Sequence, residues 1–383
     1  MTGFEVTGSG VTGSGATGSG ATDFEHALVL GKFYPPHAGH HHLIRTAAAR
    51  SRRTTVTVLA SGAESIPVAD RVAWLRAEHA GTPGLVVLGD VDDHEMDFHS
   101  DAVWELHMGV ARAVLARRAI VDGDPAGAPV DAVFSSEHYG DDMAERLGAR
   151  HVLVDLDRGA FPVSGTAVRA DPRGQWHHLA RATRVGLCAR IVVLGAESTG
   201  TTTLSRDLAE ALGAPWVPEY GREHTELKLA AARAFDPDAG VEDLVWTVGD
   251  FQDVARRQRE LADAAVDGPV LVCDNDPWAA TVWGHRYLGA PHPDIASDAH
   301  RPALYLLTDH VGVPFEQDGW RDGEHLRAWM TEEFRAGLAA RGVPWRLVTG
   351  SRDERLRHAL AACEEAVAEH FRFAPPLAPR EAR

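Results

Sequence analysis

Features that would place this chain at a membrane or outside the cell are missing from its sequence. No apolar run approaches the roughly 18 residues that a bilayer span requires, so we expect no transmembrane helix and no membrane partner. The N-terminus lacks a basic segment followed by an apolar stretch, so no secretory signal is expected. Only three cysteines occur, far apart, which predicts a cytoplasmic location and no disulfide framework: Cys188, Cys273 and Cys363.

Positive charge is also scarce in this chain. Its 38 Lys and Arg residues stand against 55 Asp and Glu residues, and the net charge is -17. This balance argues against a surface that coats nucleic acid, and we expect no direct DNA binding. A hydrophobic content of 44% and a charged content of 24% are typical of a globular protein. Because 383 residues are too many for one ordinary core, two domains are expected.

The order of apolar runs divides the chain into four parts. Residues 1–25 repeat a short Thr, Gly and Ser unit with little to bury, which predicts a disordered tail. Residues 26–185 and 189–372 each alternate β-rich runs with helical patterns, and residues 373–383 form a Pro-rich tail. Alternation of this kind predicts an α/β fold with two doubly wound parallel-sheet domains.

The expected elements follow from these runs. In the first domain, we expect strands at 27–30, 54–60, 85–91, 131–136 and 151–156, with helices at 41–51, 69–80, 101–119 and 141–149. In the second domain, we expect strands at 189–195, 269–276, 302–308 and 344–350, with helices at 201–213, 324–342 and 351–373.

The stretch "LGKFYPPHAGHHHLI" joins an expected strand to an expected helix through Gly and Pro residues. A Gly-containing turn that leads into a helix N-terminus makes an anion site, because the first N–H groups of the helix are free. His37 and His40 are three residues apart, so both can face one phosphate chain. A zinc site is the alternative, but no Cys pair or H-E-x-x-H pattern lies nearby. A third interpretation is that the histidines merely lie scattered at the start of a helix. It fits His41 and His42 better than His37 and His40.

Two motifs in the first domain resemble the signatures of the HIGH-superfamily nucleotidyltransferases. The pattern G-x-F-x-P-x-H-x-G-H is matched in full by Gly31, Phe33, Pro35, His37, Gly39 and His40. About 125 residues later, "PVSGTAVR" resembles the second signature, and this resemblance implies that it opens a helix holding the β- and γ-phosphates of ATP. Its matching residues are Ser164, Gly165, Thr166 and Arg169.

Further segments resemble the bifunctional NadR family, which joins a nicotinamide mononucleotide (NMN) adenylyltransferase to a ribosylnicotinamide kinase. They are "IPVADRVAWLRAEH", "FSSEHYGDDMAERLGARHVLVDLDR" and "RADPRGQWHHL". The resemblance implies AMP transfer from ATP to NMN, with Mg²⁺ on the phosphates. It implies phosphate contacts by His37, His40, Lys32 and Arg169. For the acceptor, the candidates are Arg71, Trp74 and Trp104, although core packing is an equal alternative for each Trp.

The second domain contains a phosphate-binding loop without its lysine. In "VVLGAESTGTTTL", Gly195 and Gly200 have the P-loop spacing, but Thr201 stands where G-x-x-x-x-G-K-[ST] requires Lys. That lysine supplies a point charge to the β- and γ-phosphates, which a threonine hydroxyl cannot do. The other loop candidates are Ser198, Thr202 and Thr203.

Other segments of the second domain resemble the rest of a kinase site. Thr202 and Asp274 are the expected Mg²⁺ residues, because Asp274 ends an apolar strand as a Walker B residue does. Resemblance to the NadR kinase region implies substrate or lid roles for a further set, namely Glu219, Arg222, Asp276, Asp318 and Arg321.

Several alternatives remain open at this point. The second domain is an inactive scaffold or nucleotide sensor, a weak kinase helped by another cation, or a kinase with an altered substrate. The candidate cations are Arg206, Arg321 and Arg327. In the first domain, the acceptor is NMN or another phosphate, such as pantetheine phosphate or a small alcohol phosphate. Some NadR proteins carry an N-terminal helix-turn-helix, whereas this chain has the Thr/Gly/Ser tail there. The sequence leaves homo-oligomer formation open.

Overall fold

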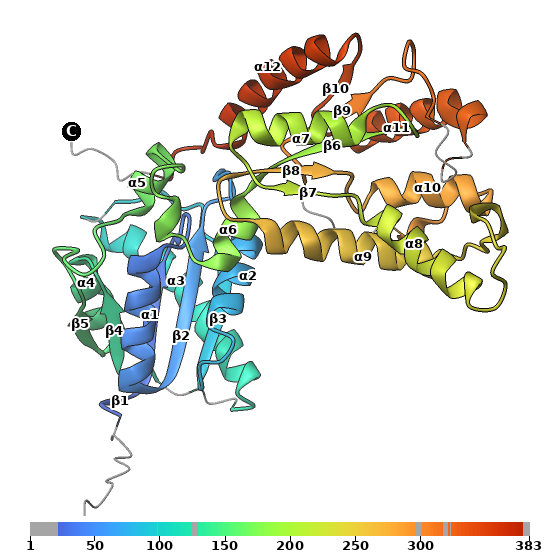
Figure 1. Ribbon diagram of the computed structural model, residues 1–383. Coiled ribbons are helices and arrows are strands. Elements are labelled where there is room, and N and C mark those ends of the chain that lie inside the picture. The colour runs from blue at the N-terminus through green and yellow to red at the C-terminus, as the bar shows by residue number, and fades with distance from the viewer. Residues whose placement is uncertain are drawn as a thin grey trace, which may run out of the picture.

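The computed structural model describes residues 22–97, 99–124, 127, 129–295, 301–316, 321 and 323–377. These residues form two α/β units, each built on a five-stranded sheet whose paired strands are all parallel (Figure 1). The predicted fold class is therefore confirmed. None of the described helices has the length and apolar content needed to cross a bilayer.

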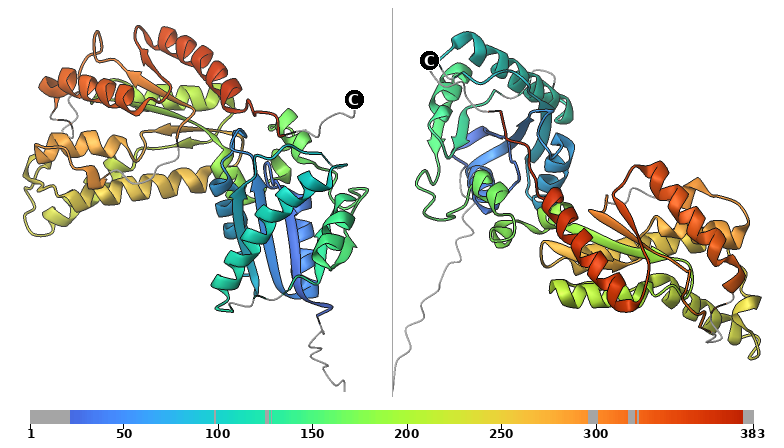
Figure 2. Two further views of the ribbon diagram at one scale, coloured as in Figure 1. Left: turned by 180° about the vertical axis from the view of Figure 1, so that it is seen from behind. Right: turned by 90° about the horizontal axis from the view of Figure 1, so that it is seen from above.

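The first unit has the strand order β3-β2-β1-β4-β5. Its strands are β1 (Phe24–Gly31), β2 (Ser51–Ala60), β3 (Leu85–Val91), β4 (Ala132–Ser135) and β5 (Arg150–Leu153). Its helices are α1 (Ala38–Arg50), α2 (Val68–Glu78), α3 (Asp101–Val121), α4 (Tyr139–Leu147) and α5 (Gly165–Ala170), followed by the 3-10 turn η1 (Trp176–His178) and by α6 (Arg181–Leu187). Helices α1 and α3 cover opposite faces of the sheet (Figures 1 and 2).

The second unit has the strand order β10-β9-β6-β8-β7. Its strands are β6 (Ala189–Gly195), β7 (Trp216–Val217), β8 (Val270–Asp274), β9 (Leu304–Thr308) and β10 (Trp345–Val348). Its helices are α7 (Thr201–Leu212), α8 (Tyr220–Arg233), α9 (Val248–Ala265), α10 (Ala279–Leu288), α11 (Arg327–Arg341) and α12 (Arg352–His370). Its 3-10 turns are η2 (Val241–Asp243), η3 (Pro293–Ile295) and η4 (Glu324–Leu326).

Each unit places one central strand at the point where the sheet order changes direction. Strand β1 pairs with β2 on one side and β4 on the other, and β6 pairs with β8 and β9 in the same way. In open parallel sheets, ligands bind at the carboxyl end of the strands at this switch point. The segments after Gly31 and Gly195, which the sequence marks as phosphate loops, occupy these two positions.

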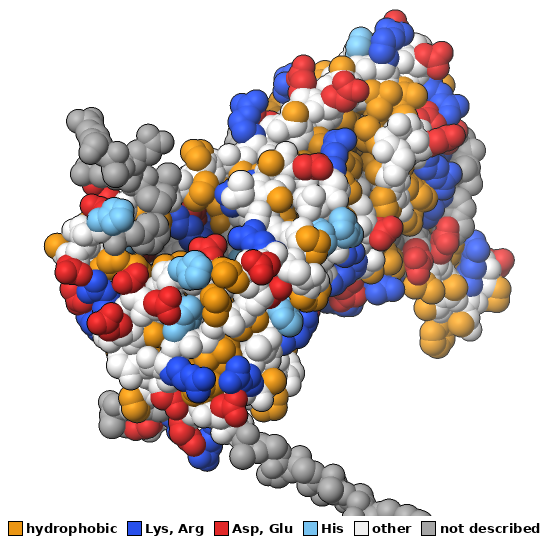
Figure 3. Space-filling view, turned by 90° about the vertical axis from the view of Figure 1, so that its left-hand side faces the viewer, with side chains coloured by type: hydrophobic (Ala, Val, Ile, Leu, Met, Phe, Trp, Pro, Cys, Tyr) orange, Lys and Arg blue, Asp and Glu red, His pale blue; other side chains and the backbone are white. Residues whose placement is uncertain are grey.

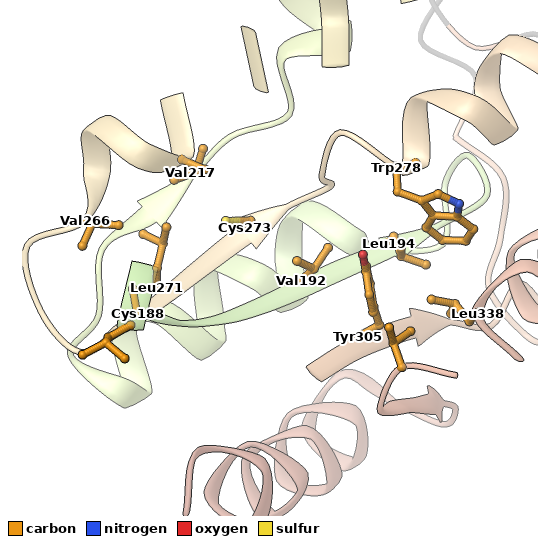
Figure 4. Close-up of a cluster of buried hydrophobic side chains, with 14 of the residues drawn as sticks. Cys188, Val192, Leu194, Val217, Val266, Leu271, Cys273, Trp278, Tyr305 and Leu338 are labelled. Atoms are coloured by element: carbon orange, nitrogen blue, oxygen red, sulfur yellow. The ribbon is translucent and has the colours of Figure 1, made fainter. Parts of the chain in front are cut away.

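A single hydrophobic cluster connects the two units. It includes Tyr34 and Ile66 from the first unit together with Val192 and Tyr305 from the second. Figure 4 shows part of this cluster, where Trp278, Leu194 and Tyr305 lie near one another. Tyr305 and Trp278 pack edge to face, with ring centroids 5.9 Å apart. Because one core crosses the boundary, we expect the units to resist separation more than domains joined only by a linker.

Helix α6 is the direct connection between the units, and Trp74 on α2 packs against it. A Cβ placed on Gly186 would come within 2.3 Å of the Trp74 indole. Only glycine at this position allows the ring to lie directly on the helix backbone. The end of α12 also contacts α6, because Nε2 of His370 lies 2.9 Å from the carbonyl oxygen of Leu187.

A buried ion pair fixes the turn that follows β1. The Arg71 guanidinium lies 2.6 Å from Oε2 of Glu64, and neither side chain has exposed surface. Arg71 also donates to the carbonyl oxygens of Ile66 and Lys32, each at 2.9 Å through Nε and Nη1. The pair therefore joins α2, the loop before it and the turn after β1 through contacts that exclude water.

Replacing Arg71 with Met should lower the free energy of unfolding by about 3–5 kcal/mol, because a buried carboxylate would lose its partner. The measurement is chemical denaturation of the purified variant. Arg45→Met is the matched control, since Arg45 forms an ion pair with Glu78 in which its own side chain is 57% exposed. The control should change the free energy of unfolding by less than about 1 kcal/mol. Equal effects of the two substitutions would contradict the structural role of the buried pair.

Candidate functional site

The first cavity lies at the carboxyl end of β1 and has a volume of about 570 Å³. Its wall is formed by the loop between β1 and α1, the segment after β3, helix α3 and the start of α5. It brings together most of the sequence-predicted residues of the first domain, namely Gly31, Lys32, Phe33, His37, Gly39, His40, Trp104, Ser164, Gly165, Thr166 and Arg169.

Two of the four clustered histidines face this cavity. The rings of His37 and His40 stack with centroids 3.6 Å apart, and the backbone N–H of His37 donates to Nδ1 of His40 at 3.3 Å. His37 is buried, and its Nδ1 atom has no hydrogen-bond partner. Burial, together with the nearby Arg158 charge, lowers the pKa of His37 to about 3. Burial and the adjacent His37 also hold the pKa of His40 well below its usual range, so both imidazoles are neutral near pH 7.

The other two histidines have structural positions. His41 is buried, and its Nδ1 atom lies 3.0 Å from Nε2 of His79. His42 packs against the ring of Phe161 with centroids 5.3 Å apart. No three ligand atoms from the histidine cluster lie close enough to hold a metal ion among the residues that the structure describes. The zinc alternative for this stretch therefore has no support in the fold.

Lys32 contributes a charge at the edge of the cavity. Its Nζ atom lies 3.6 Å from Oε1 of Glu64 and donates to the carbonyl oxygen of Leu377 at 2.9 Å. Desolvation by burial lowers the pKa of Lys32, while the Glu64 charge opposes that shift. The lysine is about one third exposed and can still reach a ligand in the cavity.

The second predicted motif lines the same cavity through α5. The hydroxyl of Ser164 accepts a hydrogen bond from the backbone N–H of Ala167 at 3.0 Å, which caps the helix start. A Cβ on Gly165 would meet the carbonyl oxygen of Tyr34 at 2.8 Å, so this close approach requires glycine. Arg169 donates to that same carbonyl at 2.6 Å and to the Thr166 hydroxyl at 3.2 Å. These contacts hold the guanidinium at the cavity wall.

The structure does not bring all predicted acceptor residues to the cavity. Trp104 lines it, but Arg71 is fully buried against Glu64, and Trp74 packs on α6 at the boundary between the units. We therefore assign no acceptor role to Arg71 or Trp74. Both residues match a family pattern for reasons of packing, because they hold α2 against the turn and against the second unit.

A group that sequence reasoning missed lines the same cavity near Trp104. Asp92 accepts hydrogen bonds from Nδ1 of His94 at 2.8 Å and from Nδ1 of His107 at 2.6 Å. Burial acts to raise the pKa of Asp92, but the hydrogen bonds from His107 and His94 keep it below its usual value. The available signal was the polar run "DDHEMD" directly after the strand at 85–91, where carboxyl-end residues point toward ligands.

The second cavity, of about 150 Å³, lies at the carboxyl end of β6. Its wall includes many of the predicted residues of the second domain, namely Gly195, Ser198, Thr201, Thr202, Glu219, Arg222, Asp276 and Arg321. Gly200 and the exposed Thr203 lie at the start of α7 outside that wall. Asp318 lies outside the described residues.

The loop between β6 and α7 has the backbone shape expected of a phosphate loop. Gly200 has a φ of 87°, and Ser198 also lies in the left-handed region with a φ of 55°. Two buried arginines hold the loop carbonyls from beneath: Arg355 donates to Thr199 at 2.7 Å, and Arg327 donates to Ser198 at 3.4 Å. The shape is therefore maintained by side chains outside the motif.

Thr202 and Asp274 form a pair that fits a magnesium ion. The Thr202 hydroxyl donates to Oδ2 of Asp274 at 2.6 Å, and the buried Oδ1 atom has no hydrogen-bond partner. A hydroxyl beside an unpartnered carboxylate oxygen is the donor set that Mg²⁺ takes in P-loop proteins. Burial raises the pKa of Asp274, while hydrogen bonds from Thr202 and Thr201 oppose that shift.

The two remaining predicted carboxylates of the second site differ in their partners. Burial and the Asp274 charge raise the pKa of Glu219 to about 7, although Asn275 donates to Oε1 of Glu219 at 2.7 Å. Both oxygens of Asp276 are occupied, by the backbone N–H of Ala279 at 2.9 Å and by the Tyr305 hydroxyl at 2.5 Å. Glu219 is therefore the group that can exchange a proton near neutral pH, whereas Asp276 has a structural role.

The arginines considered as substitutes for the P-loop lysine lie in different places. Arg206 lies over the ring of Trp216 at 4.5 Å and is absent from the cavity wall. Arg327 donates to the carbonyl oxygens of His310 and Val313 as well as Ser198, so it is committed to backbone. Only Arg321, of these three, lines the cavity, and it forms an ion pair with Glu316.

Comparison with known proteins gives a family model and curated relatives. A model described as "AAA domain" matches residues 190–355. Trifunctional NAD biosynthesis/regulator protein NadR of Salmonella typhimurium (strain LT2) is 24% identical over 310 residues. The protein of the same name from Escherichia coli (strain K12) is 24% identical over 311 residues. Each alignment covers 77% of this chain and 71% of the relative.

Two solved structures share the fold of the chain. A crystal structure of NadR protein in complex with NR has a TM-score of 0.61 at 21% identity, and covers 91% of this chain and 97% of the other. A crystal structure of NadR protein in complex with NAD and AMP-PNP has a TM-score of 0.60 at 21% identity, with 91% and 98% covered. These values show that both units occur together in the same arrangement of sheets and helices.

The raised pKa of Glu219, at about 7, predicts how stability depends on pH. A carboxyl whose pKa is higher in the folded state contributes stability at acid pH, and this contribution is lost as the pH rises through the folded value. Between pH 5 and pH 8, the wild-type protein should therefore lose free energy of unfolding that the Glu219→Gln variant retains. Chemical denaturation at both pH values measures this change in the free energy of unfolding. Glu223→Gln is the control, because Glu223 is exposed. Parallel pH curves for wild type and Glu219→Gln would contradict the raised pKa.

Proposed function

Because this chain belongs to the NadR family and is related to enzymes of NAD biosynthesis, we propose that its first domain transfers AMP from ATP to NMN, forming NAD and releasing pyrophosphate. Two relationships support the choice of substrates. One structural neighbour was solved with NAD and AMP-PNP, and the other with NR.

The observation that carries this proposal is the cavity at the end of β1. Its wall presents the N-terminus of α1 with His37 and His40, together with Arg169 and Thr166 from α5. Lys32 adds a further cation at the edge. The free N–H groups at the start of α1, together with the cations Lys32 and Arg169, suit a triphosphate. Helix N-termini and guanidinium groups both bind phosphate oxygens favourably.

The reaction requires no covalent enzyme intermediate. The 5′-phosphate of NMN attacks the α-phosphorus of ATP, the new P–O bond forms, and the bond to pyrophosphate breaks. The protein's part is to position both phosphates and to stabilise the charge that builds up. Neutral His37 and His40 can each donate an imidazole N–H, and Lys32 and Arg169 neutralise charge. Mg²⁺ on the phosphates supplies additional charge neutralisation.

A test of the acceptor compares three reactions on the purified chain. NAD formation from NMN and ATP is measured beside adenylyl transfer to pantetheine phosphate and cytidylyl transfer from CTP to a small alcohol phosphate. The proposal predicts that NMN with ATP has the highest kcat/KM. A preference for either of the other acceptors would retain the transferase chemistry and reject the assigned substrate.

Replacing His37 or His40 with Ala should lower adenylyl transfer by about 10²–10³-fold, because each change removes one preorganised donor. Initial rates of NAD formation give the measurement. His42→Ala is the matched control, since His42 belongs to the same cluster but does not itself line the cavity; it packs against Phe161, which does. The control should keep wild-type activity. If His37→Ala or His40→Ala also keeps it, that histidine has no role in the reaction.

For the second domain, we propose phosphoryl transfer from ATP to nicotinamide riboside at a rate limited by the missing lysine. The loop after β6 has two residues in the left-handed region and is held by buried arginines. Thr202 and Asp274 can hold Mg²⁺, which would neutralise phosphate charge at this site. Glu219, with its pKa raised to about 7 by burial and the Asp274 charge, can accept the proton of the attacking hydroxyl. Arg222 also lines this cavity and adds positive charge.

Replacing Thr201 with Lys should raise the rate of riboside phosphorylation by about 10²–10³-fold, the range expected for one charge-stabilising donor. The measurement is ADP release that depends on nicotinamide riboside. Thr203→Lys is the matched control, because Thr203 is exposed and lies outside the cavity wall. A Thr201→Lys variant no faster than wild type would show that the loop lacks more than a charge, and would favour a nucleotide-sensing role.

A further inference from the structure

The chain returns to the first unit after its last helix. Helix α12 ends at His370, and the segment that follows crosses from the second unit to the first, near α5 (Figures 1 and 2). The sequence predicted a Pro-rich tail from residue 373. The structure instead packs residues 373–377, which we name the C-terminal strap, against the loop that follows β1.

Two hydrogen bonds and one ring contact hold the beginning of the C-terminal strap. The N–H of Ala374 donates to the Ser65 hydroxyl at 2.7 Å, and the carbonyl oxygen of Ala374 accepts from the Tyr34 hydroxyl at 2.9 Å. That same Tyr34 hydroxyl accepts from the N–H of Ser65 at 2.9 Å. The ring of Phe373 packs edge to face on Tyr34 with centroids 6.1 Å apart. Both backbone groups of residue 374 are thus satisfied by the first unit.

The end of the C-terminal strap reaches the cavity itself. Pro376 and Leu377 line it, and the carbonyl oxygen of Leu377 accepts a hydrogen bond from Nζ of Lys32 at 2.9 Å. On its other side, Lys32 lies 3.6 Å from the buried carboxylate of Glu64. An ammonium group has three N–H donors, and the Leu377 carbonyl takes one of them, so donors remain for a ligand.

From these contacts we propose that the C-terminal strap completes the first cavity by positioning Lys32 for the phosphates of ATP. The proposal rests on the phosphate role assigned to Lys32 in the proposed function. A lysine side chain is flexible, and the hydrogen bond to Leu377 together with the nearby Glu64 charge restricts the positions that its ammonium group takes. The functional unit of the first site therefore includes residues from both ends of the chain, and Leu377 acts through Lys32 as a positioning residue.

The test compares two shortened chains with the full-length protein. A chain that ends at Pro375 lacks the Leu377 carbonyl but retains both bonds of Ala374. A chain that ends at Ala378 retains that carbonyl within a peptide bond, and is the matched control. The KM for ATP in NAD formation should rise about threefold to tenfold in the Pro375 chain, the range expected for one net hydrogen bond. The KM for NMN should change by less than about twofold.

A second readout does not depend on catalysis. The chain contains two lysines, Lys32 and Lys228, so an NMR spectrum of protein labelled at the lysine Nζ and Cε atoms contains two side-chain signals. Lys228 lies far from the strap in the sequence and pairs with Asp250 at 2.8 Å, which makes it an internal reference. The Lys32 signal should shift in the Pro375 chain and not in the Ala378 chain, and the Lys228 signal should stay unchanged in both.

A further variant keeps the full chain length and replaces both Pro375 and Pro376 with Ala. Loosening the strap in this way should move the Lys32 signal and the KM for ATP in the same direction as truncation. An unchanged Lys32 signal, an unchanged KM, or tighter ATP binding after truncation would overturn the proposal, and the last result would show that the strap competes with phosphate. Absence of NAD formation in the full-length protein would instead reject the proposed function, while the NMR readout would still test the strap.

Discussion

The buried carboxylate of Glu64 is the group that holds the first site together. It lies 2.6 Å from Arg71 and 3.6 Å from Lys32, and neither it nor Arg71 has exposed side-chain surface. A charge without access to water must keep its partners, because loss of one leaves the other uncompensated. Arg71 also lies over the Tyr34 ring, with its guanidinium carbon 4.3 Å from the centroid. Through these contacts, α2 and the loop before it hold the turn after β1, and Lys32, His37 and His40 line one cavity.

The two sites occupy equivalent positions in their sheets but differ in charge. The first has Lys32 in its phosphate-binding turn, whereas the second has Thr201 at the P-loop lysine position, and its wall combines Arg222 and Arg321 with Glu219, whose pKa is raised. Helix α12 contacts the second site and leads toward the first. Its Arg355 donates to the P-loop carbonyl of Thr199, and its C-terminal end leads into the strap that bonds Lys32. On the face shown in Figure 3, acidic and basic side chains are interspersed.

The sequence predicted the parallel sheets and both phosphate loops because these features depend on local patterns. The β3 strand and the β6 strand were predicted at their observed bounds, since each is a short apolar run with a clear end. Arg71 and Trp74 were assigned to the acceptor, although the fold buries one against Glu64 and packs the other on Gly186. Those partners come from other elements, so no local pattern reveals them. The same reason explains why the contact between Leu377 and Lys32, 345 residues apart, was not foreseen.

The central claim is that the turn after β1 binds the triphosphate of ATP. A crystal structure of the protein with a non-hydrolysable ATP analogue and NMN tests it most directly. The account predicts phosphate oxygens within hydrogen-bonding distance of His37, His40 and Lys32, with the NMN phosphate beside the α-phosphorus. Nucleotide found only in the cavity at the end of β6, with the turn after β1 empty, would contradict it.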